Sequence, residues 1–329
     1  MTGFWRRCRQ VSVASQTVQT RMPLAQWRQL LQRAAIIYDL DGVVIDVRGT
    51  YRLAYLRGIQ SYFRLELGIA LPQRPASMAA VHLLKRHRGF NDPAEVTAIL
   101  LRLLLRANVQ NRQSDQAFAQ QWIAAALADG RLDRWRSETL RDLDESAQQY
   151  IIQSERPDVA LALVREHYVG SAAMAQVFGT APRLQVLGLA RRDRLLADPA
   201  LGDERPMAVY SGRTFAEIQW VIKKFARFAP LLQAGRGAAI EAVDTGAHKP
   251  DGAPLLRLAE RLGRDVVVYV GDLEADRQAL LDARRRDPGR TWLLGQVLAS
   301  PQSRVWPDAD AAGTAVDVLL AAEIVDMSN

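Results

Sequence analysis

Short apolar runs alternate with amphipathic segments along much of the chain, and the two patterns predict different elements. Four runs are almost entirely apolar, which is typical of strands buried in a parallel sheet; they cover 34–38, 207–210, 266–270 and 292–294. Three segments have apolar residues at helical spacing, namely 215–225, 255–262 and 275–285. Strands that alternate with helices predict an α/β fold with a parallel sheet.

A long block of helical pattern separates the first predicted strand from the second. From Thr50 to about Tyr168, apolar residues recur at helical spacing, and Pro93 and Pro157 stand where a first helical turn would begin. We expect about five or six helices in this block. The length of 329 residues exceeds the size at which single cores usually stop growing, which favours two domains. We therefore predict a Rossmann-like parallel-sheet core formed by 34–48 and 206–329, with a mostly helical cap, 49–205, inserted into it.

The composition is ordinary for a globular protein, with 49% hydrophobic and 24% charged residues. The formal net charge is +7, but residues 1–34 hold six arginines and no acidic residue. Most of the positive excess therefore belongs to a basic N-terminal extension, 1–33, which we expect to be disordered. Because the rest of the chain is near neutral and carries no RNA-binding motif, we expect no nucleic-acid partner.

Cysteine content and hydropathy limit the kinds of site that the chain can form and the compartment in which we expect it. Cys8 is the only cysteine, so neither an intramolecular disulfide nor a zinc–thiolate site can form. The longest apolar stretch, 98–105, contains Arg102 and is far shorter than the roughly 20 residues that span a bilayer. We expect a cytoplasmic protein with no membrane partner. The composition of the extension also resembles an organellar transit peptide, which leaves import as an alternative, and the sequence gives no indication of oligomeric state.

Polar residues follow the predicted strands at the points where each strand ends. These residues are Asp39 and Asp41 after the first strand, Ser211 and Gly212 after the second, and Asp272 and Asp276 after the third. Lys249 precedes a predicted helix, and it is one of only four lysines in a chain that otherwise uses arginine. Ligands of open parallel sheets bind outside the carboxyl ends of the strands, so we expect these side chains to converge.

Four carboxylates at one sheet edge repel one another unless a cation is present. Oxygen ligands without histidine or cysteine suit Mg²⁺, which also accepts ligands from a substrate phosphate. Two acids placed two residues apart can divide the chemistry, one attacking phosphorus and the other protonating the leaving oxygen. The sequence therefore predicts phosphoryl transfer at a magnesium site.

The strand-end residues resemble the four motifs of the haloacid dehalogenase (HAD) superfamily. The motif sequences are Ile-Ile-Tyr-Asp39-Leu-Asp41-Gly42, Val-Tyr-Ser211-Gly212-Arg213, Lys249-Pro250 and Gly271-Asp272-Leu-Glu-Ala-Asp276. A helical cap between the first two motifs resembles subfamily IA of that superfamily. The resemblance implies an α/β core with an inserted helical cap and a hydrolase that uses Mg²⁺.

The resemblance also implies individual roles. Asp39 would be the nucleophile that forms an aspartyl-phosphate, and Asp41 would be the general acid and base, its backbone carbonyl also binding Mg²⁺. Asp39, Asp41, Asp272 and Asp276 would form the metal site, the last of them acting directly or through water. Ser211 would hydrogen-bond the phosphoryl oxygens, and Lys249 would neutralise charge.

Further residues are candidates for substrate contact. Gly42 marks the turn where the family's flap leaves the sheet, and Gly212 follows the motif serine. The segment 85–92 looks similar to a glycine-containing cap element of subfamily IA, which makes Arg86, Arg88 and Asn91 candidates. We expect Arg213 to be structural or to lie solvated at a helix start.

Two departures from relatives within the resemblance favour phosphoryl chemistry. Dehalogenases of the superfamily lack the second acid of the first motif, whereas Asp41 is present, and the transport ATPases carry Lys-Thr-Gly-Thr where this chain has Leu-Asp-Gly-Val. The sequence thus predicts a Mg²⁺-dependent phosphomonoesterase whose partner is a small phosphorylated metabolite. A phosphomutase of the same superfamily, or a catalytically silent binding or regulatory module, are the alternatives.

Overall fold

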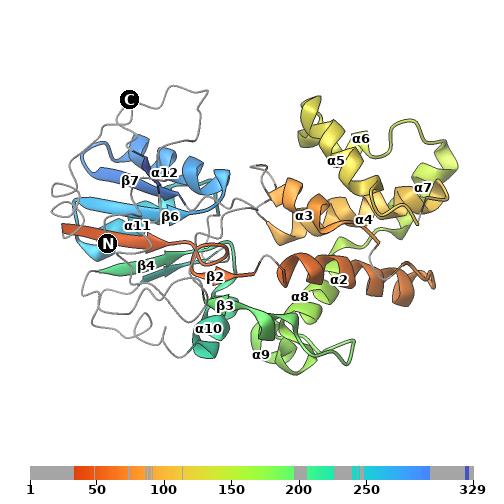
Figure 1. Ribbon diagram of the computed structural model, residues 1–329, viewed down its shortest axis with the longest axis horizontal. Coiled ribbons are helices and arrows are strands. Elements are labelled where there is room, and N and C mark those ends of the chain that lie inside the picture. The colour runs from red at the N-terminus through yellow and green to blue at the C-terminus, as the bar shows by residue number, and fades with distance from the viewer. Residues whose placement is uncertain are drawn as a thin grey trace, which may run out of the picture.

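The computed structural model describes residues 33–47, 49–72, 75–85, 87, 90, 92–112, 114–195, 206–225, 239–242, 244, 248–296 and 323–325. Almost all of the predicted N-terminal extension lies outside these residues. Figure 1 shows two lobes, one built on a sheet and the other built of helices. Among the described helices, none is long and apolar enough to cross a membrane.

A six-stranded sheet forms the first lobe, with strand order β5-β4-β1-β6-β7-β8. Its strands are β1 (Ala34–Tyr38), β4 (Met207–Tyr210), β5 (Ala239–Glu241), β6 (Val266–Gly271), β7 (Thr291–Gln296) and β8 (Glu323–Val325). The first five in spatial order run parallel, and β8 pairs antiparallel with β7. The α/β prediction is confirmed, and β5 and β8, which the apolar pattern did not reveal, extend the sheet at its two edges.

Register brings the strand ends to one edge of the sheet. Tyr38, the last residue of β1, pairs with Val209 near the end of β4 and with Val270 near the end of β6. The residues that follow these three strands must therefore emerge close together, at the edge where ligands of parallel sheets bind.

Both faces of the sheet are covered, by helices α10 (Phe215–Lys224), α11 (Ala253–Leu262) and α12 (Glu274–Arg286). Because side chains alternate along a strand, Ile37 packs with the apolar residues of α11 and α12, whereas Ile36 belongs to the opposite core, with Ile222 of α10. All five residues of β1 are buried, which explains its continuous apolar run.

The second lobe lies between β1 and β4 in the chain. Its α-helices are α2 (Tyr51–Glu66), α3 (Met78–Lys85), α4 (Pro93–Val109), α5 (Phe118–Ala128), α6 (Trp135–Glu138), α7 (Glu145–Ser154), α8 (Pro157–Val169) and α9 (Met174–Phe178). Short 3₁₀ helices are η3 (Leu132–Arg134), η4 (Ser171–Ala173) and η5 (Leu189–Arg192). Pro93 and Pro157 occupy the first turns of α4 and α8, as their sequence context predicts. We call this lobe the cap and the sheet lobe the core.

A small ribbon joins the two lobes. Strand β2 (Ile45–Asp46) leaves the core toward the cap, and β3 (Arg194–Leu195) returns from it. The two strands pair antiparallel, with Ile45 beside Leu195 and Asp46 beside Arg194, so both chain crossings run side by side between the lobes (Figure 1).

Close packing of α2 on α8 generates a stability prediction. A β-carbon added at Gly58 of α2 would lie 2.5 Å from the Cα of Val164, because the two helix backbones approach closely there. We expect Gly58→Ala to lower the free energy of unfolding by about 1–3 kcal/mol through overpacking, measured by urea denaturation. Gly49→Ala is the control, since a β-carbon there meets nothing within 4 Å. Equal stability of the two variants would contradict the close approach.

Candidate active site

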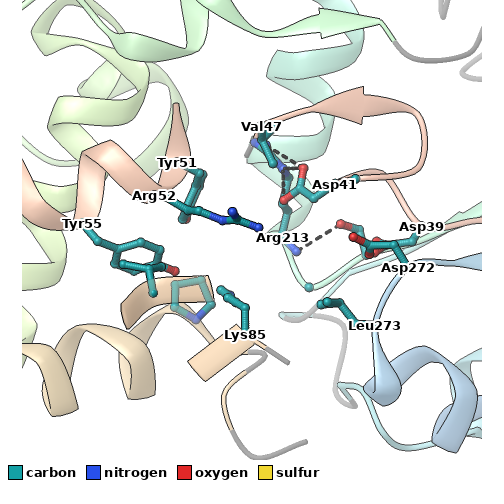
Figure 2. A pocket seen from close by; sticks show the side chains of 15 residues that line it. Asp39, Asp41, Val47, Tyr51, Arg52, Tyr55, Lys85, Arg213, Asp272 and Leu273 are labelled. Carbon is teal, nitrogen blue, oxygen red and sulfur yellow. Dashed lines mark hydrogen bonds and ion pairs between the residues drawn. The ribbon is translucent and has the colours of Figure 1, made fainter. Parts of the chain in front are cut away.

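The carboxyl edge of the sheet opens into a pocket shared by the core and the cap. Asp39, Asp41, Ser211, Gly212 and Asp272 all line it from the core side. Figure 2 shows Asp39, Asp41 and Asp272 on this side of the cavity. The structure therefore brings the residues that follow β1, β4 and β6 to one place.

Lys249 lies beneath this pocket and joins two of the acids. Its Nζ is 2.9 Å from Oδ1 of Asp39 and 2.6 Å from Oδ1 of Asp276, and its side chain is almost fully buried. The ammonium also lies 5.3 Å and 5.6 Å from the ring centroids of Tyr210 and Tyr269. Burial alone lowers the pKa of Lys249, but the charges of Asp276 and Asp39 outweigh burial and raise it, so the lysine stays charged.

Asp276 is held by four hydrogen-bond donors. Its Oδ1 accepts from Lys249 and, at 2.6 Å, from the hydroxyl of Tyr269; its Oδ2 accepts from the backbone amides of Asp272 and Leu273 at 3.1 Å and 3.0 Å. A carboxylate has about four acceptor sites, and all are in use here. This geometry suits Asp276 to fixing Lys249 and the start of α12 rather than to direct metal ligation.

Burial and neighbouring negative charges raise the pKa values of Asp39 and Asp272. Burial, together with the charges of Asp276 and Asp41, raises the pKa of Asp39 to about 7 despite the nearby Lys249. Burial and the charges of Asp276 and Asp39 raise the pKa of Asp272 well above its usual range. Three carboxyl groups share one buried ammonium, so the cluster lacks the positive charge that full ionisation would require.

The donor set fits a hard divalent cation. Oxygen atoms of Asp39 and Asp272 lie within 4.8 Å of each other and of Asp276, which stands behind them with its own acceptor sites in use. Among the described residues, Oδ1 of Asp272 is buried without a hydrogen-bond partner. Carboxylate oxygens without nitrogen or sulfur ligands suit Mg²⁺.

Gly42 makes room for Asp272. The glycine has a φ of +81°, and a β-carbon on it would lie 2.1 Å from Oδ2 of Asp272. We had expected Gly42 to be a flap hinge and a substrate contact. It does line the pocket, and the structure adds a steric requirement at that position.

Arg213 is the functional residue whose placement the sequence analysis missed. Its side chain is buried, so the solvated alternative is wrong. Its Nε and Nη2 donate to Oδ1 of Asp41 at 2.9 Å and 2.8 Å, and Nη2 also donates to the hydroxyl of Tyr168 at 2.6 Å. The guanidinium lies 5.7 Å from the ring centroid of Tyr51. The sequence position of Arg213 could have indicated that it lies at the site, because it follows the same strand end as Ser211.

A chain of hydrogen bonds continues from Arg213 into the cap. The Tyr168 hydroxyl donates to Oδ2 of Asp193 at 2.6 Å, and the Thr50 hydroxyl donates to the other oxygen of Asp193. Thr50 and Asp193 stand in the two segments that connect the core and the cap. The side chain of Asp41 is thus linked to both crossings.

The remaining candidates lie at the pocket or outside the described residues. The Oγ of Ser211, which is buried, accepts from the backbone amide of Arg213 at 3.3 Å. Helix α10, which follows Ser211, is capped by Thr214 and Glu217. The predicted substrate residues Arg86, Arg88 and Asn91 lie outside the part of the chain that the structure describes.

No family model matches the sequence, and no curated protein matches it. Among solved structures, the chain is similar to phosphatase Tt82 from Thermococcus thioreducens, with a TM-score of 0.52 and 18% identity over 84% of this chain and 98% of that one. A HAD-superfamily hydrolase, subfamily IA, variant 1, from Geobacter sulfurreducens matches with a TM-score of 0.39 and 16% identity over 77% of this chain and 84% of that one. At this level of identity, the likeness to the Thermococcus structure shows a similar fold.

Charge crowding predicts how pH and Mg²⁺ change stability. The pKa of Asp39 is about 7 in the folded chain, above its usual value of 3.8, so the folded state binds more protons between pH 4 and 7. Without divalent ions, this group's contribution to stability is therefore lost as pH rises through 7. Mg²⁺ competes with protons, so we expect it to raise the melting temperature more at pH 8 than at pH 5.5. Binding at a hundredfold excess over Kd stabilises by about 2.7 kcal/mol.

Asp272→Asn tests this directly by calorimetry. Loss of one crowded charge should raise the stability of the metal-free chain at pH 8 and remove most of the Mg²⁺ effect. The exposed Asp265→Asn is the matched control and should behave like the wild type. An undiminished Mg²⁺ effect in Asp272→Asn would place the cation elsewhere.

Proposed function

We propose that the chain is a Mg²⁺-dependent phosphohydrolase that acts on a small phosphorylated metabolite through an aspartyl-phosphate on Asp39. The observation that carries this proposal is the setting of the Asp39 carboxylate. It stands at the end of β1 in the pocket, with Lys249 2.9 Å away and with Asp41 and Ser211 lining the same cavity. The likeness in fold to a solved structure that is named a phosphatase supports it.

Asp39 is suited to the role of nucleophile. The backbone amide of Leu40 donates to its Oδ1 at 2.8 Å and Lys249 to the same oxygen, which fixes the carboxylate in one orientation. The other oxygen attacks phosphorus, the bond from phosphorus to the leaving oxygen breaks, and an acyl phosphate forms on Asp39.

Asp41 is placed to move the protons. It protonates the leaving oxygen in the first step and accepts a proton from water in the second, when water attacks phosphorus and phosphate leaves Asp39. Its side chain is about one-third exposed and faces the pocket, whereas its partner Arg213 is buried. Arg213 is therefore a positioning residue, which sets the direction of the Asp41 carboxylate.

Asp39, Asp272 and the backbone carbonyl of Asp41 would hold Mg²⁺, with Asp276 behind them. The cation would supply the positive charge that the carboxylate cluster lacks and that a phosphate dianion requires. Ser211 would hydrogen-bond the phosphoryl oxygens. Lys249 would remain paired with Asp39 and offset charge on both protein and substrate.

Hydrolysis of p-nitrophenyl phosphate is the first test. We expect turnover with Mg²⁺, loss of turnover with a chelator, and a fall of about a thousandfold or more in kcat for Asp39→Asn, because the nucleophile is removed. The exposed Asp265→Asn should retain full activity.

The same assay separates the alternatives. A phosphomutase would convert a sugar phosphate into its isomer without releasing phosphate. A silent binding or regulatory module would give no turnover with any member of a broad phosphometabolite panel. Either outcome, in folded protein with Mg²⁺, would refute the hydrolase proposal.

Arg213→Lys tests the positioning of Asp41. A lysine keeps the charge but cannot donate from several fixed nitrogens to Asp41 and Tyr168 together. We expect kcat to fall by about 10²-fold with a smaller change in KM, because the general acid is misaligned. Arg264→Lys, at an exposed site of the core, is the control. Unchanged kcat in folded Arg213→Lys would mean that Asp41 is oriented without it.

A further inference from the structure

The cap side of the pocket carries a second set of polar groups that the proposed chemistry does not use. Arg52 and Tyr55 from α2 and Lys85 from the end of α3 line the cavity. Figure 2 shows these three side chains across the cavity from Asp39 and Asp272. They come from the opposite lobe to the phosphoryl-transfer residues, so they face the other end of a bound substrate.

The burial and the unpaired hydroxyl of Tyr55 indicate that this part of the pocket binds a ligand. The residue is fully buried, and among the described atoms its hydroxyl has no hydrogen-bond partner. A buried polar group that is left unpaired is unfavourable, and a ligand acceptor would remove that penalty. Figure 2 shows the hydroxyl turned toward the cavity. Burial raises the pKa of Tyr55 well above its usual range, so the phenol remains a hydrogen-bond donor.

Arg52 and Lys85 line the same pocket as Tyr55. Nη2 of Arg52 lies 2.9 Å from Nδ1 of His82 on α3, a contact that orients the guanidinium. Nζ of Lys85 lies 5.9 Å from the ring centroid of Tyr55. Burial lowers the pKa of Lys85 to about 8, the direction expected of an ammonium withdrawn from water.

The three side chains form a set of donors. Guanidinium and ammonium groups only donate hydrogen bonds, and the unpaired phenol donates its proton. All three line the pocket, and the Tyr55 hydroxyl is buried there without a hydrogen-bond partner among the described atoms. A negatively charged group of a ligand would complement two positive side chains and a phenol donor on this wall.

We propose that Arg52, Tyr55 and Lys85 form a second anion-binding subsite, so that the substrate is a phosphomonoester carrying another anionic group, a carboxylate or a second phosphate, on the part that leaves. The inference rests on the proposed phosphohydrolase function. Arg52 and Lys85 supply charge, and the Tyr55 hydroxyl fixes the position of one anionic oxygen.

Matched substrate pairs test the subsite. 3-Phosphoglycerate and glycerol 3-phosphate differ by a carboxylate in place of a hydroxymethyl group, and fructose 1,6-bisphosphate and fructose 6-phosphate differ by a second phosphate. We expect kcat/KM to be at least about tenfold higher for the doubly anionic member of at least one pair, the size of one charge-assisted hydrogen bond. The pair that shows the preference identifies the second group as carboxylate or phosphate.

Variants of Arg52 and Tyr55 test whether these cap residues cause the preference for the doubly anionic substrate. Arg52→Gln and Tyr55→Phe should each reduce the ratio between the two members of the pair by about tenfold, through a higher KM for the anionic member. Arg64→Gln, an exposed arginine farther along α2, is the matched control and should leave the ratio unchanged. If both members of a pair lose activity equally in the variants, the cap cations contact the transferred phosphoryl group instead, and the subsite proposal is wrong.

Failure of the subsite and failure of the enzyme are distinguishable. Hydrolysis of p-nitrophenyl phosphate without preference in either pair would overturn the subsite alone. If nothing is turned over, calorimetric titration of the intact protein decides the question. Tighter binding of an anionic member, weakened in Arg52→Gln, would support the subsite, and equal binding of both members would overturn it.

Discussion

A single buried ammonium organises the acidic edge of the sheet. Lys249 lies between Asp39 and Asp276, and Asp276 in turn accepts from the backbone at the start of α12. These four contacts tie the segment before α11 to the ends of β1 and β6. Without the lysine, buried carboxylates would face one another with no protein cation between them, a loss that typically costs about 3–5 kcal/mol. The orientation of Asp39 therefore depends on a residue more than 200 positions away in the chain.

The two lobes of the molecule contribute side chains of different charge to the pocket. The core contributes crowded carboxylates, and the cap contributes Arg52 and Lys85. Arg213 stands at the boundary, paired with Asp41 of the core and with Tyr168 of the cap. In the proposed reaction, a phosphoryl group with its metal would complement the first lobe, and an anionic leaving part would complement the second. Neither lobe alone presents the complete arrangement.

Much of the core could be predicted because the patterns that indicate it involve residues that are close together in the sequence. Asp39, Ser211 and Asp272 each stand at the end of a short apolar run, and parallel strands place such residues at one edge. The cap wall could be predicted only in part. The segment 85–92, which begins at Lys85, could be identified as a cap element that contacts substrate, whereas Arg52 looks like a solvated helix position until α2 is folded. The same holds for Arg213, whose burial depends on Tyr51 and Tyr168. Strands β5 and β8 have only three residues each, too few to establish an apolar period.

The ribbon of β2 and β3 gives the molecule a simple topological description. Its two strands pair antiparallel, so they form a β-hairpin. The loop of this hairpin is the whole cap, a folded domain, whereas ordinary hairpin loops have a few residues. The entropy of closing a loop rises only slowly with its length, by about 0.6 kcal/mol for each doubling, and here the ribbon holds the ends together. A domain attached in this way can be enlarged, shortened or replaced without altering the path of any strand in the sheet. The size of this cap is thus a property of a loop, set at a position where the sheet does not depend on it.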